Sequence, residues 1–156
     1  LGADVLYCQG DISSADARSA MLAKIKNHFG KLNVLVNNAG FNDGLGLETS
    51  PEDFMTSVQN NLLHVYTMTH YALPQFRKGP GCILNLGSKV SVTGQGQTSA
   101  YAAAKGAISA LTREWAVELL PHSVRVNALM VAESYTPLYE KWINTFSNPQ
   151  EEDHRH

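Results

Sequence analysis

A tyrosine and a lysine near the middle of this 156-residue chain have the spacing of an acid–base pair. Tyr101 and Lys105 lie four positions apart in a predicted helix, so their side chains project from one face. An isolated tyrosine has a pKa of about 10. A cation at about 4 Å is worth roughly 4 kcal/mol at an effective dielectric constant of about 20, or about three pKa units. The spacing therefore favours a phenol that works as a general acid or base.

A tyrosine and a lysine at this spacing more commonly only cover a helix surface. Two further polar residues favour a catalytic role for the pair. Ser88 lies 13 positions before Tyr101, directly after an apolar run. Asn61 interrupts the apolar stretch of the preceding predicted helix, where asparagine competes with the backbone and is a poor helix former. We therefore predict a catalytic set formed by Asn61, Ser88, Tyr101 and Lys105.

Apolar runs and amphipathic segments alternate along the chain, and they predict the elements that position this set. Short apolar runs predict strands over residues 4–8, 34–36, 81–86 and 124–128. Apolar residues at a spacing of three to four predict helices over residues 14–29, 51–73, 99–120 and 137–146. Pro74 and Pro121 are expected to end two of them. The order predicts an α/β fold with a doubly wound parallel sheet, covered by helices on both faces.

The residues that follow each predicted strand are the candidates for ligand binding, because ligands bind such sheets at the carboxyl ends of the strands. These residues are Asp11-Ile12, Asn37-Asn38-Ala39-Gly40, Gly87-Ser88 and Thr136-Pro137. The small residues Ala39 and Gly40 let a flat ligand approach the backbone. Taken alone, the Asn-Asn-Ala-Gly run is equally typical of a simple turn.

The charge balance argues against several classes of partner. The chain has 12 Lys+Arg and 14 Asp+Glu, so its net charge is -2, which disfavours nucleic acid or an anionic membrane as the partner. No apolar run approaches the roughly 18 residues that a bilayer span requires. No cluster of metal-ligating residues is present, so we expect no metal. Cys8 and Cys82 are interpreted as two buried thiols of a cytoplasmic protein.

The order and spacing of these motifs resemble those of the short-chain dehydrogenase/reductase family. The matching segments extend from Asp11 to about Leu138: Asp11-Ile12, Asn37-Asn38-Ala39-Gly40, Asn61-Leu62, Ser88, Tyr101-Ala102-Ala103-Ala104-Lys105 and Arg125-Val126-Asn127-Ala128. The resemblance implies a Rossmann-type sheet. It also implies hydride transfer between NAD or NADP and a secondary alcohol or carbonyl compound.

The resemblance also implies a role for each matching residue. Tyr101 would exchange a proton with the substrate oxygen, and Ser88 would hydrogen-bond that oxygen. Lys105 would lower the pKa of Tyr101 and hold the nicotinamide ribose. Asn61 would hold a local break in its helix and anchor a water in a proton relay to Lys105. The implied cofactor contacts are Asp11, Ile12, Asn38, Ala39, Gly40, Tyr101, Lys105, Ser134 and Thr136.

Two segments near the expected site are similar to those of sugar-oxidising members of the family, L-fucose dehydrogenase-like ones especially. These segments are residues 93–97 and residues 131–139. They contribute Gln95 and Glu133, which would suit a polyhydroxylated substrate. We therefore expect a small-molecule substrate, a sugar (aldose) or another secondary alcohol, contacted by Ser88, Gln95, Tyr101 and Glu133.

The glycine-rich phosphate loop of the family has no counterpart in this sequence. No G-x-G-x-x-G opens a helix, and Gly94-x-Gly96 precedes the wrong helix and has no third glycine in place. We therefore expect residues 1–147 to form a partial domain that begins at the family's third strand and lacks strands at both ends. Residues 148–156 would be a polar tail.

Three interpretations of the chain remain open, and the simplest of them is an aggregation-prone gene fragment with no role. In the second it belongs to an active NAD(P)-dependent enzyme. That enzyme would be a homodimer or homotetramer through helices 51–73 and 99–120, where small residues permit close contact: Ala102, Ala103, Gly106 and Ala107. In the third it is a catalytically inactive fragment that acts as an association module through the same helices.

Overall fold

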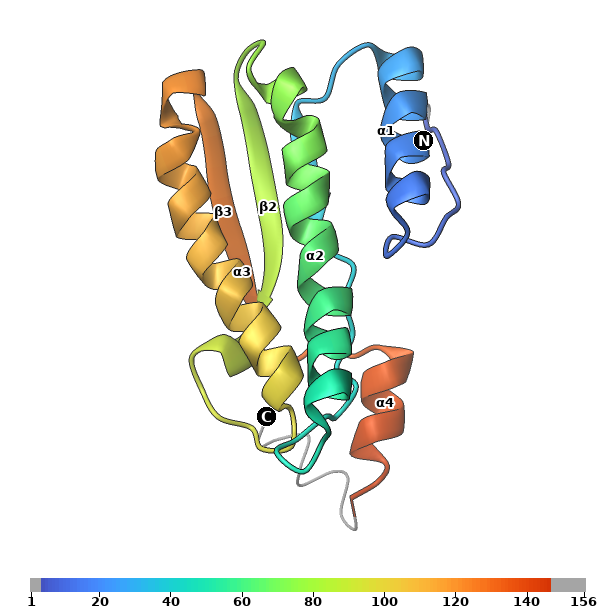
Figure 1. Cartoon of the computed structure of the whole chain (residues 1–156), viewed down its shortest axis with the longest axis vertical. Coiled ribbons are helices and arrows are strands. Elements are labelled where there is room, and N and C mark those ends of the chain that lie inside the picture. The colour runs from blue at the N-terminus through green and yellow to red at the C-terminus, as the bar shows by residue number, and fades with distance from the viewer. Residues whose placement is uncertain (1–3, 147–156) are drawn as a thin grey trace.

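The computed structural model describes residues 4–146 and contains three strands and four α-helices in that range (Figure 1). In chain order they are α1 (Ala15–Phe29), β1 (Val34–Asn37), α2 (Pro51–Phe76), β2 (Gly81–Ser88), α3 (Ser99–Glu118), β3 (Val124–Val131) and α4 (Pro137–Ile143). Two short 3-10 helices, η1 (Lys89–Ser91) and η2 (Leu120–His122), follow β2 and α3. The predicted polar tail, residues 148–156, lies outside the described range. None of the helices within residues 4–146 is both long and apolar enough to cross a membrane.

The three strands form one parallel sheet in the order β1-β2-β3. The register pairs Val34 with Cys82 at one end and Ser88 with Val131 at the other. Because all strands run the same way, their carboxyl ends meet at one edge of the sheet. The α/β class and the parallel sheet predicted from the sequence are confirmed.

The core lies between the sheet and the pair α2 and α3, which cover one face together (Figure 1). Buried apolar side chains from the strands and both helices fill it: Leu35, Val65, Ile83, Ile108 and Val126 among them. A buried polar network crosses this core. Asn37 donates to Asn85 Oδ1 at 2.9 Å, and Asn85 donates to Thr112 Oγ1 at 2.9 Å. Since these buried polar groups are partnered, the network ties β1, β2 and α3 together without leaving its amides unsatisfied.

The opposite face of the sheet has no helix over it within residues 4–146, which corrects the prediction of helices on both faces. Val34, Val36 and Leu129 on this face are 55%, 52% and 54% exposed. Near the strand β1, α1 lies beside α2 rather than over the bare face (Figure 1).

The prediction of a strand over residues 4–8 is wrong. The segment is irregular, and Val5 and Tyr7 are 79% and 81% exposed. A strand needs a neighbouring strand for its backbone N–H and C=O groups, and the described part of the chain offers none to this segment. Cys8 and Cys82 are free thiols that are half-buried rather than buried.

Local sequence explains the ends of α1. The Ser14 hydroxyl accepts a hydrogen bond from the backbone of the first turn, and Gly30 ends the helix with a left-handed φ of 72°. The Arg18 guanidinium is buried and donates to the carbonyls of Ile12 (2.7 Å) and Ser13 (2.8 Å). Arg18 therefore ties the turn at residues 12–13 to the first turns of α1.

The long helix α2 begins as predicted but continues past Pro74. Ser50 caps its start by accepting from Asp53 N at 3.1 Å. Its end at Phe76 is held by tertiary packing, because Phe76 is buried and a Cβ on Gly81 would lie 2.6 Å from its ring. Packing thus offsets the hydrogen bond that a proline inside a helix cannot donate.

The remaining boundaries differ from the predictions by a few residues. Pro121 lies in η2, after α3 has ended at Glu118. β3 runs on to Val131, beyond its predicted end at residue 128, because it pairs with β2 over the full length of that strand. The last helix, α4, ends at Ile143 rather than at residue 146.

Candidate active site

The predicted catalytic residues come from the carboxyl end of β2 and the first turns of α3. Ser88 is the last residue of β2 and accepts from Val90 N at 3.4 Å through its hydroxyl. Tyr101 and Lys105 share one face of α3, with Lys105 Nζ 5.5 Å from the centroid of the Tyr101 ring. Strand and helix therefore bring Ser88, Tyr101 and Lys105 to one place, as the sequence predicts.

The Lys105 ammonium group is buried against the central strand. The residue is 4% exposed, and Nζ donates to the Leu86 carbonyl at 2.6 Å. Burial lowers the pKa of Lys105, because the charged form loses solvation. The bond to Leu86 fixes the position of the cation relative to β2 and hence to Ser88.

The environment of Tyr101 differs from the expectation of a lowered pKa. Burial raises the pKa of Tyr101, and a side-chain hydrogen bond with Ser88 acts in the opposite direction. The Lys105 ammonium group lies 5.5 Å from the centroid of the Tyr101 ring and donates to the Leu86 carbonyl. The raised pKa favours the protonated form of the phenol beside Ser88.

Asn61 joins α2 to the loop that follows β1. Its Oδ1 accepts from Phe41 N at 2.9 Å, and its Nδ2 donates to the Ser57 carbonyl at 3.1 Å. The expected local break is absent, because α2 runs uninterrupted through Asn61 and its side chain bonds back to its own helix. A Cβ on Gly40 would lie 3.2 Å from Asn61 Oδ1 and 3.6 Å from Lys105 Nζ, so the loop lies directly against both side chains.

A cleft of about 280 Å³ opens over Ser88 and Tyr101. Six residues predicted from the sequence line it: Ser88, Gln95, Tyr101, Glu133, Ser134 and Thr136. Four residues that were not predicted as contacts line it too: Asn42, Ala132, Tyr139 and Trp142. The three-residue spacing places Tyr139 and Trp142 on one face of α4, but the sequence does not show that this face lines a cleft.

The cleft has one charged wall. Glu133 lines the cleft from the segment after β3 and forms an ion pair with Lys89 of η1. The second carboxylate oxygen of Glu133 is buried and accepts no hydrogen bond from residues 4–146. The wall therefore presents an oriented acceptor next to Ser88 and Tyr101, which line the same cleft.

A second cleft lies on the other side of the Gly40 loop. It is lined by Asp11, Ile12, Ser13, Ala39, Gly40, Phe41, Asn60 and His64. Four predicted cofactor contacts thus meet here, whereas Asn38 is exposed and lies outside the lining. Hydrogen bonds from the Ser13 backbone and hydroxyl lower the pKa of Asp11. The lining combines the small residues Ala39 and Gly40 with the Asp11 carboxylate and the apolar Ile12, so these residues fit the adenosine part of a dinucleotide.

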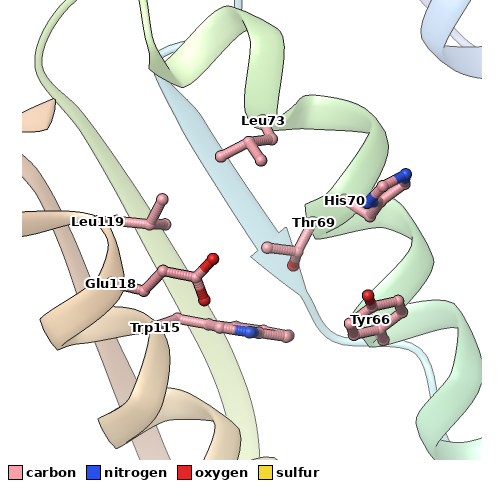
Figure 2. Close-up of a pocket in the computed structure, with 7 residues that line it drawn as sticks. All are labelled: Tyr66, Thr69, His70, Leu73, Trp115, Glu118 and Leu119. Carbon is pink, nitrogen blue, oxygen red and sulfur yellow. The ribbon is translucent and has the colours of Figure 1, made fainter.

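A third hollow lies apart from both clefts, between α2 and α3 (Figure 2). Tyr66, Thr69, His70 and Leu73 line it from α2, and Trp115, Glu118 and Leu119 line it from α3. None of the predicted catalytic or cofactor residues is among them. The hollow therefore belongs to the outer surface of the helix pair rather than to the candidate active site.

Comparisons with known proteins agree with this geometry. Residues 1–145 match the family model described as short chain dehydrogenase. L-fucose dehydrogenase of Mus musculus is 35% identical over 147 residues, which is 93% of this chain and 54% of the relative. This chain therefore spans about half the length of the curated relatives that it matches.

Solved structures give the same result. The crystal structure of Cj0485 dehydrogenase is 47% identical, with a TM-score of 0.86 over 92% of this chain and 56% of the other. The structure of NAD+-bound xylitol dehydrogenase is 28% identical, with a TM-score of 0.78 over 85% of this chain and 53% of the other. The Rossmann-type arrangement predicted from the sequence is confirmed.

Proposed function

Because this chain belongs to the short-chain dehydrogenase family, we propose that it carries the acid–base site of an NAD(P)-dependent oxidoreductase acting on a secondary alcohol or its carbonyl product. One observation carries the proposal. The hydroxyls of Ser88 and Tyr101 line the same cleft, and the buried cation of Lys105 lies next to the Tyr101 ring. A substrate oxygen placed between the two hydroxyls meets one donor and one proton-transfer group.

The chain's own residues account for the proton transfer. In the reduction direction, Tyr101 gives its phenolic proton to the substrate oxygen as that oxygen gains negative charge, and Ser88 donates a second hydrogen bond to it. In the oxidation direction, the phenolate takes the proton from the substrate hydroxyl. Lys105 favours that phenolate by its charge. A bound nicotinamide supplies the hydride donor or acceptor.

The second cleft would hold the adenosine part of the dinucleotide. Asp11 and Ile12 would contact the adenine, and Asn38, Ala39 and Gly40 would line the adenosine-ribose side. Ser134 and Thr136, which line the cleft of Ser88, would meet the nicotinamide side together with Tyr101 and Lys105. Titration with NADH and NADPH, followed by nucleotide fluorescence, decides which of the two is bound.

The chemistry of the cleft supports a sugar as the substrate. Asn42, Gln95 and Glu133 offer polar groups for several hydroxyls, and Tyr139 and Trp142 offer flat apolar rings. The Glu133 oxygen that has no partner within residues 4–146 would accept a hydrogen bond from a substrate hydroxyl, while the ion pair with Lys89 would hold the carboxylate in place. The similarity to L-fucose dehydrogenase and to xylitol dehydrogenase agrees with this class of substrate.

The test is the reduction of NAD+ and NADP+ by L-fucose and other aldoses. The assay uses the protein as its gene encodes it. The Tyr101→Phe variant should lose about 10²- to 10⁴-fold in kcat, the usual contribution of a positioned acid–base group. Lys78→Met, at an exposed position after α2, is the control and should keep its activity. Full activity of the phenylalanine variant would reject the proposed role of Tyr101.

We also propose that two copies associate through the outer side of α2 and α3 as a homodimer or as part of a homotetramer. Leu63, Tyr66 and Tyr71 are 39%, 49% and 46% exposed on α2, and the hollow of Figure 2 lies between the helices. Light scattering on a sizing column should give a multiple of the monomer mass. Ala103→Glu, on the exposed side of α3, should lower it, whereas Val5→Glu should not.

A further inference from the structure

The histidine at position 64 is a buried titratable group that the proposed chemistry does not use. His64 lies in α2, one helical turn after Asn61, and it is 3% exposed. Its side chain lines the second cleft together with Ala39 and Gly40. Histidine is a poor filler for an apolar core, so its contacts need a physical reason.

The imidazole holds the loop that follows β1. His64 Nε2 lies 2.9 Å from the Ala39 carbonyl, and a carbonyl only accepts, so Nε2 carries the proton. One turn earlier, Asn61 Oδ1 accepts from Phe41 N at 2.9 Å. The two side chains therefore fix the backbone on both sides of Gly40, one through a carbonyl and the other through an amide.

The loop held in this way lines the second cleft through Ala39, Gly40 and Phe41, and the next residue, Asn42, lines the first. Gly40 packs so closely that an added Cβ would lie 3.2 Å from Asn61 Oδ1 and 3.6 Å from Lys105 Nζ. Ala39 and Gly40 face Asp11 and Ile12 across the second cleft. A shift of the Ala39 carbonyl would therefore change the width of that cleft.

Burial and nearby charge keep the imidazole in the form that suits this contact. Burial lowers the pKa of His64 first of all, and the hydrogen bond to the Ala39 carbonyl acts in the opposite direction. The charges of Lys105, from α3, and of Arg18, from α1, lower the pKa further. The neutral ring, protonated at Nε2, is therefore the form that packs here near pH 7.

We propose that His64 is a positioning residue that holds the Ala39 carbonyl and so keeps the 38–41 loop in the shape that binds the dinucleotide. The proposal rests on the proposed function, because the loop is assigned to the cofactor there. Asn61 holds the other side of the same loop, so loss of His64 releases one of two anchors. The dinucleotide affinity should therefore fall more than the rate of the chemical step.

The experiment compares His64→Gln with His64→Phe in the protein from its natural reading frame. Glutamine keeps an N–H donor that can reach the Ala39 carbonyl, and phenylalanine keeps only the ring shape. The phenylalanine variant should raise the Kd for NADH or NADPH and the KM for the oxidised form about tenfold, with kcat at saturation changed less than threefold. The glutamine variant should stay within about threefold of the parent in all three.

A second readout does not depend on the proposed function. Without nucleotide, the amides of Gly40 and Phe41 should exchange hydrogen faster in the phenylalanine variant than in the parent or the glutamine variant. His122→Phe, in η2, is the matched control and should leave affinity and exchange unchanged. If exchange changes as stated but the parent binds neither nucleotide, the positioning of the loop stands and its assignment to a cofactor fails.

Two results would overturn the proposal. One is unchanged exchange and affinity in the phenylalanine variant, and the other is an equal loss in the glutamine variant. Thermal unfolding checks that each variant folds. If His64→Phe does not fold, His64→Asn takes its place, because its shorter amide does not reach Ala39, and the same comparison with glutamine applies.

Discussion

The two faces of the sheet are built on different principles. The face under α2 and α3 buries both apolar side chains and a polar network in which Asn85 bridges Asn37 and Thr112. The opposite face leaves Val34 and Val36 about half exposed, with no helix over them within residues 4–146. One face is packed and hydrogen-bonded, and the other leaves apolar side chains exposed.

The residues proposed for acid–base chemistry are concentrated on the packed face. The side chains of Asn61, Tyr101 and Lys105 come from α2 and α3 and lie on the packed face. Their positions depend on contacts that are all present in residues 4–146, such as Lys105 with the Leu86 carbonyl. Ser88 completes the predicted set from the carboxyl end of β2, at the edge of the sheet. Substitutions on the two faces should therefore have very different effects.

The largest effect is expected on activity at Lys105. Lys105→Met removes the buried cation beside Tyr101 and should lower kcat/KM by about 10²- to 10³-fold. The loss should be smaller at high pH, where the phenol ionises without help. Steady-state kinetics from pH 6 to 10 measures both. A loss that is the same at every pH would mean that the cation does not act through the phenol.

The next effect is expected on stability at Asn85. Asn85→Ala leaves the buried Asn37 amide and Thr112 hydroxyl each short of a partner, so we expect a loss of about 2–4 kcal/mol. Urea unfolding followed by circular dichroism measures it. A loss below about 1 kcal/mol would indicate that water replaces the missing amide.

A smaller effect should appear when the pH falls. The pKa of His64 is lowered in the folded protein, so between that pKa and about 6.5 the unfolded chain binds more protons. This contribution to stability is therefore complete above about pH 6.5 and decreases as the pH falls below it. The midpoint of urea unfolding should drop less in His64→Gln than in the parent from pH 7.5 to 5.5. An equal decrease of the urea midpoint in the two proteins would show that His64 does not contribute to the pH dependence of stability.

The smallest effect is expected on the bare face. Val36→Thr exchanges a methyl group for a hydroxyl on a side chain that is 52% exposed, so it should change the unfolding free energy by less than about 0.5 kcal/mol. The same urea experiment checks it. A cost near the 1.5–3 kcal/mol of a fully buried apolar side chain would show that something covers this face in solution.

The sequence predicted the parts of the site that depend on local spacing. Tyr101 and Lys105 were predicted from their four-residue spacing in a helix, and Ser88 from its position after an apolar strand. His64 and Trp142 could not be found in this way. Their proposed roles depend on which loop or cleft lies next to them in the folded chain. The periodicity of a helix does not show which parts of the chain its residues contact.

The errors about the fold have the same origin. Residues 4–8 have the composition of a strand, but composition does not show whether a partner strand is present. Pro74 is a valid stop signal that the burial of Phe76 overrides. The bare face was missed because apolar alternation reports which residues suit burial, not what covers them.

The ladder between β2 and β3 ends with the pair Ser88 and Val131. Ser88 thus stands opposite the last residue that the strands fix, and the segment carrying Glu133, Ser134 and Thr136 begins immediately afterwards. Insertions or deletions in that segment start beyond the last pair of the ladder, so they would reshape this side of the cleft without shifting Ser88. The register therefore separates the length of that segment from the position of Ser88.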